Sequence, residues 1–314
     1  MRGPRVTLDQ WRTLQAVIDC GGYAQAAEFL HKSQSSISYT VAKLQEQLGM
    51  ELLSIEGRKA VLTPVGEALL RRARQLVDQA VDLEKLAASL EQGWEPELRV
   101  AIDGAFPTPV VIDACKSFAP QSQGCRLLLR EEILSGAEEA LLEKKVDLAI
   151  TGWVPPGFMG ERLLDIHFIA LAHPQHALHQ LGRKILQQDL AGNIQVVVKD
   201  SAQKRVRDSG WLGAEQRWTV SSVSSAINLL INGLGFAWMP THVAQQYILD
   251  GSLKPLDLDI EYEKHFSLYL VFSQPDFAGP ATRLMAQLIR DFSARYSAGQ
   301  PSCADLRNQG CENQ

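Results

Sequence analysis

The stretch YAQAAEFLHKSQSSISYTVA, residues 23–42, determines how the rest of the chain is organised. It predicts two short helices joined by a tight turn. Ala26 and Ala27 are small enough to let the first of these helices approach its neighbours closely, and Ser33 is a side-chain cap for the second. The second helix has a polar outer face. A helix-turn-helix presents its recognition helix to DNA in this way, so the stretch predicts a DNA-reading element.

The flanking residues complete a small helical head. Thr7 and Gln10 form the pattern of a capping box at the start of a helix over 8–18, and Gly21-Gly22 ends that helix. A third helix is expected over 34–48, because four apolar residues recur on one of its faces at spacings of four, three and four. These residues are Ile37, Val41, Leu44 and Leu48.

Two short apolar pieces follow between Leu52 and Thr63, separated by a turn at Gly57. They predict a hairpin wing with a basic tip. The candidate DNA contacts are therefore the polar residues in the first turns of the third helix and the two basic residues at the wing tip. A Gln side chain can bond adenine, hydroxyls can reach phosphates, and basic side chains can enter a groove or touch the backbone. These candidates are Ser33, Gln34, Ser35, Ser38, Tyr39, Lys43, Arg58 and Lys59.

Residues 64–92 predict one long linker helix that starts at Pro64. Leucines recur every seven residues, and alanines recur at a second heptad position, which is typical of a helix that pairs with a copy of itself. The alternative is a single long helix packed on its own domain. The expected dimer seam is Leu69, Ala73, Leu76, Ala80, Leu83, Ala87 and Leu90. A dimer holds two recognition helices at a fixed separation, so the DNA target is expected to be an inverted repeat.

In the body, residues 97–297, apolar strand patterns alternate with helical ones, which predicts a parallel sheet with covering helices. The expected fold class is α/β, with a winged helix-turn-helix over 6–63, the linker helix over 64–92 and this body. The polar residues 298–314 predict a disordered tail.

Candidate ligand-binding residues lie where the predicted strands of the body end, because open α/β sheets bind ligands at the carboxyl ends of their strands. Hydroxyl groups at a predicted helix start near Ser222 favour a small anionic ligand. The alternative is that these serines only cap the helix. The candidates are Asp103, Ala105, Phe106, Thr108, Thr151, Trp153, Ser201, Ser221, Ser222 and Ser224.

The head resembles the LysR-type transcriptional regulators. The resemblance is carried by Leu14, Gly22, Ala26-Ala27, Leu30-His31, Ser33 to Ser38, Leu44, Leu48-Gly49, Leu52-Leu53, Gly57-Arg58, Leu62-Thr63 and Gly66. The family often has basic residues where Tyr39 and Ala42 stand, and an Arg near Ile55. This chain therefore has fewer charges with which to bind phosphates, and its DNA affinity should depend less on counterion release.

The resemblance implies a periplasmic-binding-protein-like effector domain, with lobe I over 97–167 and 273–297 and lobe II over 168–272. It implies a small-molecule effector between the lobes, and a dimer or a tetramer. The other expected partners are double-stranded DNA and RNA polymerase, and no membrane is expected. An enzyme or carrier with an appended DNA-binding head fits the body equally well, but it needs neither the head nor the leucine seam. A DNA-binding structural protein without an effector would have a body without a cleft.

Charge and composition agree with these expectations. The net charge is −5, yet residues 1–77 carry ten Lys/Arg against seven Asp/Glu, which suits a DNA-contacting head on an acidic body. The five scattered cysteines, the absence of a signal-type apolar stretch and the absence of a long apolar run favour a cytoplasmic protein. No phosphate loop, H-E-x-x-H or C-x-x-C motif occurs. His173, His176 and His179 lie close in sequence without a Cys or Glu ligand nearby, so no metal, cofactor or enzymatic activity is expected.

Overall fold

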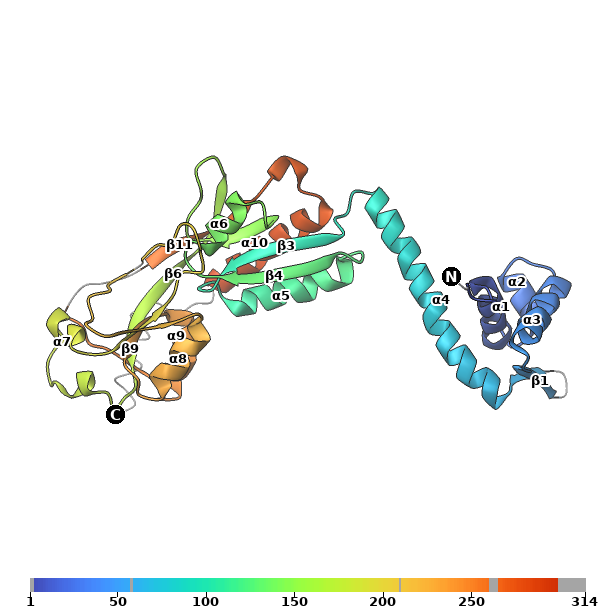
Figure 1. Ribbon diagram of the computed structural model, residues 1–314, viewed down its shortest axis with the longest axis horizontal. Coiled ribbons are helices and arrows are strands. Elements are labelled where there is room, and N and C mark those ends of the chain that lie inside the picture. Colours follow the sequence, from blue (N-terminus) through green and yellow to red (C-terminus); the bar gives the residue numbers. More distant parts are fainter. Residues whose placement is uncertain (1–2, 57–58, 209, 260–264, 299–314) are drawn as a thin grey trace. The chain divides into compact units, whose positions relative to one another are not determined.

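The computed structural model describes residues 3–56, 59–208, 210–259 and 265–298. The chain divides into two compact units, residues 1–92 and 93–314. Figure 1 labels many of their helices and strands. The first unit is the head with its long helix, and the second unit is the body.

The first unit has the order helix, helix, helix, hairpin, long helix that the sequence predicts. Its elements are α1 (Leu8–Asp19), α2 (Tyr23–Phe29), α3 (Gln34–Leu48), β1 (Leu53–Glu56), β2 (Lys59–Leu62) and α4 (Pro64–Glu91). The two strands pair antiparallel, with Leu53 opposite Leu62. The wing and the long helix are therefore present with nearly the predicted bounds.

Side-chain caps fix where these helices begin. The backbone N–H of Gln10 donates to the Thr7 hydroxyl at 3.3 Å, and the backbone N–H of Thr7 donates to the side-chain oxygen of Gln10 at 2.8 Å. These two bonds complete the predicted capping box. The Ser33 hydroxyl accepts from the Ser36 N–H at 3.2 Å and starts α3. Gly49 ends α3 in the left-handed conformation, with φ 68°.

The core of the first unit gathers the apolar stripes of its helices. Leu14, Ile37, Leu44 and Leu52 are fully buried, and Leu70 of α4 joins them. The first turns of α4 therefore complete the head. The sequence left open whether the long helix pairs with a copy of itself or packs on its own domain. The first turns of α4 pack on their own domain.

The body alternates strands and helices. Its elements are β3 (Glu97–Asp103), α5 (Thr108–Phe118), β4 (Arg126–Glu132), α6 (Gly136–Leu142), β5 (Leu148–Thr151), β6 (Gly160–Ala172), α7 (Gln187–Ala191), β7 (Gln195–Val198), β8 (Arg217–Val220), α8 (Val223–Ile231), β9 (Phe236–Pro240), α9 (Thr241–Leu249), β10 (Lys254–Pro255), β11 (His265–Phe272) and α10 (Pro280–Ala298), with short 3₁₀ turns at Ala119–Gln121, Ala177–Gln180 and Pro275–Phe277. Of the predicted tail, Ala298 is the last residue of α10, and 299–314 lie outside the described residues.

The described strands form a nine-stranded sheet in the order β4-β3-β5-β11-β6-β9-β7-β8, with β10 beside β6. Pairing is parallel around β3 and around β7, as predicted. The predicted parallel pairing does not extend to the strands between these two groups, because β11 runs antiparallel to β5 and to β6, and β6 runs antiparallel to β9. The two parallel groups are joined through these two strands.

β6 and β11 belong to both halves of the body (Figure 1). The end of β11, Tyr269–Phe272, pairs with β5, while His265–Leu268 pair with the middle of β6. The later residues of β6, Phe168–Ala172, pair with β9. Each side of this junction has its own apolar core, one with α5 and α10, and one with α8 and α9. The predicted lobe boundary at 167/168 falls within β6, and the one at 272/273 falls at the end of β11. The division into two lobes stays a prediction.

Candidate DNA-binding face and effector cavity

One face of α3 is open to solvent and polar. Gln34, Ser35, Ser38 and Lys43 are exposed, and Tyr39 has 66% of its surface exposed. The Lys43 ammonium lies 5.7 Å from the centre of the Tyr39 ring, so the two side chains form one cationic and aromatic patch. The opposite face of α3 is buried in the head core. The helix therefore presents all its candidate DNA contacts together.

Two further groups belong to this face. The Ser33 hydroxyl, besides capping α3, lies 3.1 Å from the Ser35 hydroxyl. The side-chain oxygen of Gln45 accepts from the N–H groups of Leu52 and Leu53 at 2.7 and 3.0 Å, which fixes the start of the wing against α3. Lys59 begins β2, and its side chain is not described. Arg58 lies outside the described residues.

The seam of α4 is divided between burial and exposure. Ala73 is 2% exposed and Leu69 is half-buried, because both lie where α4 packs on the head. Further along, Leu76 is 51% exposed and Leu83 is 67% exposed. Leu90 is likewise exposed, Ala87 is exposed and Ala80 is half-buried. A row of large apolar side chains on one helix stripe, open to solvent, is the surface that a coiled-coil partner covers.

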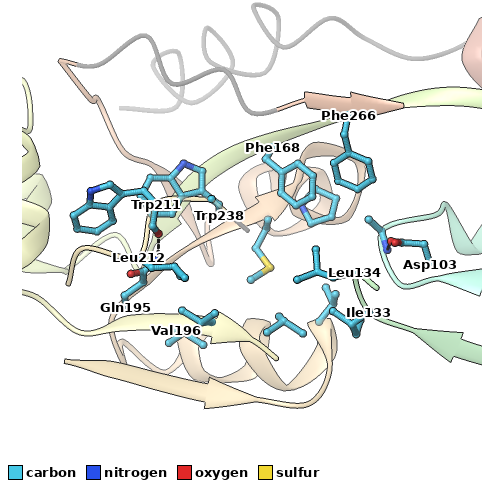
Figure 2. Close-up of a pocket in the computed structure, with 17 residues that line it drawn as sticks. Asp103, Ile133, Leu134, Phe168, Gln195, Val196, Trp211, Leu212, Trp238 and Phe266 are labelled. Atoms are coloured by element: carbon cyan, nitrogen blue, oxygen red, sulfur yellow. Dashed lines mark hydrogen bonds between the residues drawn. The ribbon is translucent and has the colours of Figure 1, made fainter. Parts of the chain in front are cut away.

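The body holds a cavity of about 110 Å³, shown in Figure 2. By the same measure one water needs roughly 10–15 Å³, so a small organic molecule fits. Its walls come from eight separate segments of the body. The lining residues are Asp103, Ala105, Ile133, Leu134, Phe168, Gln195, Val196, Val197, Val198, Gly210, Trp211, Leu212, Val223, Trp238, Met239, Pro240 and Phe266.

Aromatic side chains dominate two walls of the cavity (Figure 2). Phe168 and Phe266 stack with their ring centres 5.6 Å apart, and Trp211 and Trp238 lie 5.8 Å apart. Leu134, on a third side, has a φ of 53°, a conformation that costs energy for a branched residue. Backbone strain of this kind is concentrated at binding sites, which agrees with a functional role for the cavity.

Two buried polar side chains line the same cavity. Gln195 is 3% exposed and its amide nitrogen donates to the Trp211 carbonyl oxygen at 2.6 Å. Asp103 is 4% exposed and one of its carboxylate oxygens accepts from the Ala105 N–H at 2.8 Å. Among the described lining residues there is no Lys, Arg or His. The cavity is therefore apolar, with hydrogen-bond acceptors and without a cation.

Two of the ten predicted ligand-binding residues, Asp103 and Ala105, line this cavity. The other eight lie elsewhere. Phe106 is buried in the core, Thr108 is exposed at the start of α5, and the buried Thr151 hydroxyl lies 3.2 Å from the Trp153 carbonyl oxygen. The Ser201 hydroxyl contacts Glu132 and Ile133, and the exposed Trp153 ring lies 4.6 Å from the Arg207 guanidinium.

The serines at the start of α8 form a cap. The Ser222 hydroxyl accepts from the Ser225 N–H at 3.2 Å and donates to the Ser225 hydroxyl at 3.0 Å. Ser221 and Ser224 are exposed, and Val223 is the residue of α8 that lines the cavity. The alternative predicted for these serines, helix capping, therefore describes Ser222.

Residues 200–207, which we name the clasp, connect the two halves of the body beside the cavity. The buried Asp200 carboxylate accepts from the Ser135 hydroxyl at 2.6 Å and from the Arg207 N–H at 2.7 Å. The Ser201 hydroxyl donates to Glu132 at 2.7 Å and accepts from the Ile133 N–H at 2.9 Å. The clasp thus fixes the segment whose residues 133 and 134 form one cavity wall.

Charge pairs extend the clasp along α6. Arg207 lies 2.9 Å from the buried Glu138 carboxylate, and its guanidinium is 4.6 Å from the centre of the Trp153 ring. Hydrogen bonds from the Lys145 and Lys204 ammonium groups lower the pKa of Glu143 to about 2. The Glu143 carboxylate therefore stays charged at neutral pH beside these two ammonium groups.

Sequence reasoning missed the residues that make this cavity distinctive. Gln195 is not among the predicted ligand-binding residues, although a polar residue at the start of the apolar run Val196–Val198 is a signal for a buried hydrogen bond. Trp211 lies in an aperiodic stretch next to glycine, where no pattern predicts burial. Phe168 and Phe266 lie in β6 and β11, and which way their side chains face depends on the register between these two strands, which the sequence does not show.

The described residues contain no group of three or more His, Cys, Asp or Glu side chains that could hold a metal ion. Burial, together with the nearby charge of Lys254, lowers the pKa of His179 to about 4. No helix in the described part of the chain is both long and apolar enough to cross a membrane.

Three features define the class of protein, which is a ligand-responsive DNA-binding regulator. They are a winged helix-turn-helix with an exposed polar α3, a long helix with an exposed apolar stripe, and a separate body with a ligand-sized cavity. Residues 8–67 match the family model described as bacterial regulatory helix-turn-helix protein, lysR family, and residues 91–294 match the LysR substrate binding domain. The chain belongs to the LysR family of transcriptional regulators.

Known proteins similar to this chain are transcriptional regulators as well. It is 31% identical over 255 residues to YeeY of Escherichia coli (strain K12), an uncharacterized HTH-type transcriptional regulator, with 78% of this chain and 81% of YeeY covered. It is 30% identical to YhaJ of the same organism, with 79% and 85% covered. The fold is similar to that of full-length LysG from Corynebacterium glutamicum, solved with bound effector Arg, with a TM-score of 0.52 at 21% identity and 92% and 99% covered. The domains and relatives are those of a regulator with DNA-binding and effector-binding domains, and not of an enzyme.

Proposed function

We propose that this regulator binds an inverted-repeat promoter site as a dimer or tetramer, and that a small-molecule effector in the body cavity changes that binding. The observation that carries the proposal is that the first unit has two exposed surfaces of different kinds. The polar face of α3 is open for DNA, and the leucine stripe of α4 is open for a second copy. The two surfaces together favour a paired reader of DNA.

On this proposal, α3 lies in the major groove, with Gln34, Ser35 and Ser38 in its first two turns. Gln34 can bond adenine through both atoms of its amide, and the hydroxyls and the helix N-terminus bind phosphate. Tyr39 and Lys43 contact the backbone together, as their 5.7 Å approach favours. Lys59 and Arg58 at the wing contact the adjacent backbone or minor groove.

The pairing of two copies proceeds through the later part of α4. Leu76, Leu83 and Leu90 are exposed, and small residues at 80 and 87 allow two helices to approach closely. The body offers further exposed apolar side chains, including Leu128 and Leu129 on the edge strand β4, which support a second self-association and hence a tetramer.

The effector binds in the cavity lined by Asp103, Gln195 and the four aromatic rings. Its position between segments of both halves of the body lets an occupant change how those halves meet. RNA polymerase is the further partner, because a regulator at a promoter acts on transcription there. Since the target is chromosomal DNA, we infer a cytoplasmic location.

A footprint on the DNA upstream of the protein's own gene, with and without candidate ligands, tests this function. We expect protection of two half-sites related by a dyad and separated by about one helical turn, 10–10.5 base pairs, or a multiple of it. An effector should shift the boundaries or the strength of protection. Absence of protection at every salt concentration would exclude sequence-specific binding at that site.

A further inference from the structure

We infer that the clasp, residues 200–207, is a latch between the two halves of the body, and that its release is the movement by which the body changes DNA binding. This inference rests on the proposed function, in which an effector in the body cavity changes that binding. We call the half that contains α5 and α10 the first half, and the half that contains α8 and α9 the second half. The halves stay joined through β6 and β11, the two strands that belong to both.

The clasp follows β7 of the second half, but the bonds that it makes with other described segments end in the first half. The Asp200 carboxylate accepts from the backbone N–H of Ser135 at 3.2 Å and from its hydroxyl at 2.6 Å. The Glu139 carboxylate accepts from the N–H groups of Gln203 and Lys204 at 3.1 and 2.8 Å. A movement that separates the halves at this point therefore has to break these bonds.

The clasp can be released without unpacking either apolar core. Within residues 200–207 only Asp200 and Ala202 are buried, so release exposes little apolar surface. The Asp200 carboxylate moves with the clasp and gains water in place of its bonds to the first half. The ion pair between Lys204 and Glu143 involves a largely exposed ammonium group, and pairs of this kind contribute little stability each. Segments with few buried apolar contacts open locally while the rest of the fold stays intact.

The fit between the clasp and α6 leaves two states, docked and released. A β-carbon at Gly136, the first residue of α6, would collide with the Ser201 hydroxyl and with the Glu132 side chain. The same hydroxyl donates to the Glu132 carboxylate at 2.7 Å. Closely packed contacts of this kind are either made or lost, because they do not deform continuously. A contact with two discrete states is what a latch requires.

Release of the clasp changes one wall of the effector cavity. The Ser201 hydroxyl accepts from the Ile133 N–H at 2.9 Å, and Asp200 binds Ser135, so the clasp holds the residues on both sides of Leu134. Leu134 lines the cavity with a φ of 53°, and a strained conformation persists only where its surroundings impose it. Ile133 and Leu134 lie side by side in the lining (Figure 2). An occupant that contacts this wall differently in the two states shifts the equilibrium between them.

Hydrogen exchange measured by mass spectrometry on the full chain tests whether the clasp opens by itself. In the wild type, peptides covering 133–135 and 201–207 should exchange at least about tenfold faster than the slowest amides of β6 and β11. Asp200→Asn replaces one acceptor oxygen by a donor. It should speed exchange in 133–135 and 201–207 by about another tenfold, while rates in α8 and α9 stay within about twofold. Asp189→Asn is the matched control, because its carboxylate pairs with Arg183 at 2.7 Å away from the clasp, and it should change none of these rates.

DNA binding of the same variants, without any ligand, tests whether this opening is regulatory. At a temperature at which melting curves show every variant folded, Asp200→Asn should change the affinity for the footprinted site by at least about fivefold, the lower end of usual allosteric couplings. Ser201→Ala removes a single hydroxyl and should change the affinity in the same direction by a smaller factor, and it carries the test if Asp200→Asn does not fold. Asp189→Asn should bind as the wild type does. A variant that only loses stability also binds as the wild type does while it is folded.

Clasp peptides that exchange as slowly as β6 and β11 in the wild type would overturn the inference, because the clasp would then open only when the whole body unfolds. Unchanged DNA binding by a variant with accelerated clasp exchange would overturn it as well, and would leave the proposed function intact. Absence of a wild-type footprint would instead overturn the proposed function and the inference with it, so the two failures are distinguishable.

Discussion

The candidate DNA-binding face and the candidate effector cavity are built in opposite ways. All the described candidate contacts of α3 lie within residues 33–43, on one capped helix. The cavity draws on eight segments between Asp103 and Phe266, so no short stretch contains it. A surface made by one element depends on local composition, whereas a cavity made by many depends on how distant segments meet. A single substitution in α3 should therefore change only its own DNA contact. In the body, the effect of one substitution should depend on residues of other segments that it touches.

The largest effect is expected from Ser35→Asp in α3. A carboxylate in the first turn suits the helix N-terminus, so the head should stay folded, but it repels the phosphates that this end approaches. We expect specific DNA affinity to fall by about a hundredfold, by about tenfold for Gln34→Ala, and less for Lys43→Ala. Fluorescence anisotropy on the footprinted site and on a scrambled sequence measures this ranking. Equal losses on both DNAs for all three variants would refute it.

The next effect concerns the exposed stripe of α4. Leu83→Asp places a charge in the middle of the proposed seam, where Leu83 is 67% exposed. Sedimentation velocity should show the dimer dissociation constant rising by about tenfold or more, because burying an unpaired carboxylate is costly. Gln75→Asp adds the same charge to the exposed helix one position before a seam leucine and serves as the matched control. A dimer unaffected by Leu83→Asp would mean that pairing does not use this stripe.

A third prediction tests the joint behaviour of the body. A β-carbon at Gly136 would collide with the Ser201 hydroxyl of the clasp and with the Glu132 side chain. Gly136→Ala should lower the melting temperature by several degrees, which corresponds to about 1–2 kcal/mol for a unit of this size. Ser201→Ala removes the obstructing hydroxyl, so the double variant should lose less stability than the two single variants added together. Additive losses would show that residues 136 and 201 act independently.

The smallest effect is a pH dependence that originates at His242. Burial lowers the pKa of His242 to about 4 from its usual 6.5, and its ring packs edge-on against Tyr296 of α10. Between pH 6.5 and 4 the unfolded chain takes up a proton that the folded body does not, so stability falls as pH falls. After allowance for partial exposure, the loss from this residue should be on the order of 1 kcal/mol. Melting temperatures measured across this pH range should depend less on pH for His242→Gln than for the wild type. The pH dependence should be unchanged for His31→Gln, because His31 is exposed.

The same contrast explains what the sequence predicted. Thr7, Ser33 and Pro64 mark helix starts through bonds to residues a few positions away, and those starts are confirmed. The first half of β6 has no strand pattern in the sequence, because Arg162, Asp165 and His167 break the apolar run that marks a strand. They can be polar there because β11 supplies partners such as Ser267, which donates to Asp165 at 2.6 Å. The cavity was mostly missed for the same reason: a loop residue such as Trp211 becomes a wall only when β9 lies beside it.

The junction formed by β6 and β11 determines how the body can be divided. β11 hydrogen-bonds to β5 through Tyr269–Phe272 and to β6 along its length, while β6 continues to β9. Neither half keeps its sheet if the chain is cut between them, since each would expose the unpaired edge of a shared strand. The body should consequently resist limited proteolysis as one piece, and expression of either half alone should yield aggregated chain. Its most slowly exchanging amide hydrogens should lie in these two strands, because their bonds open only when the whole body unfolds.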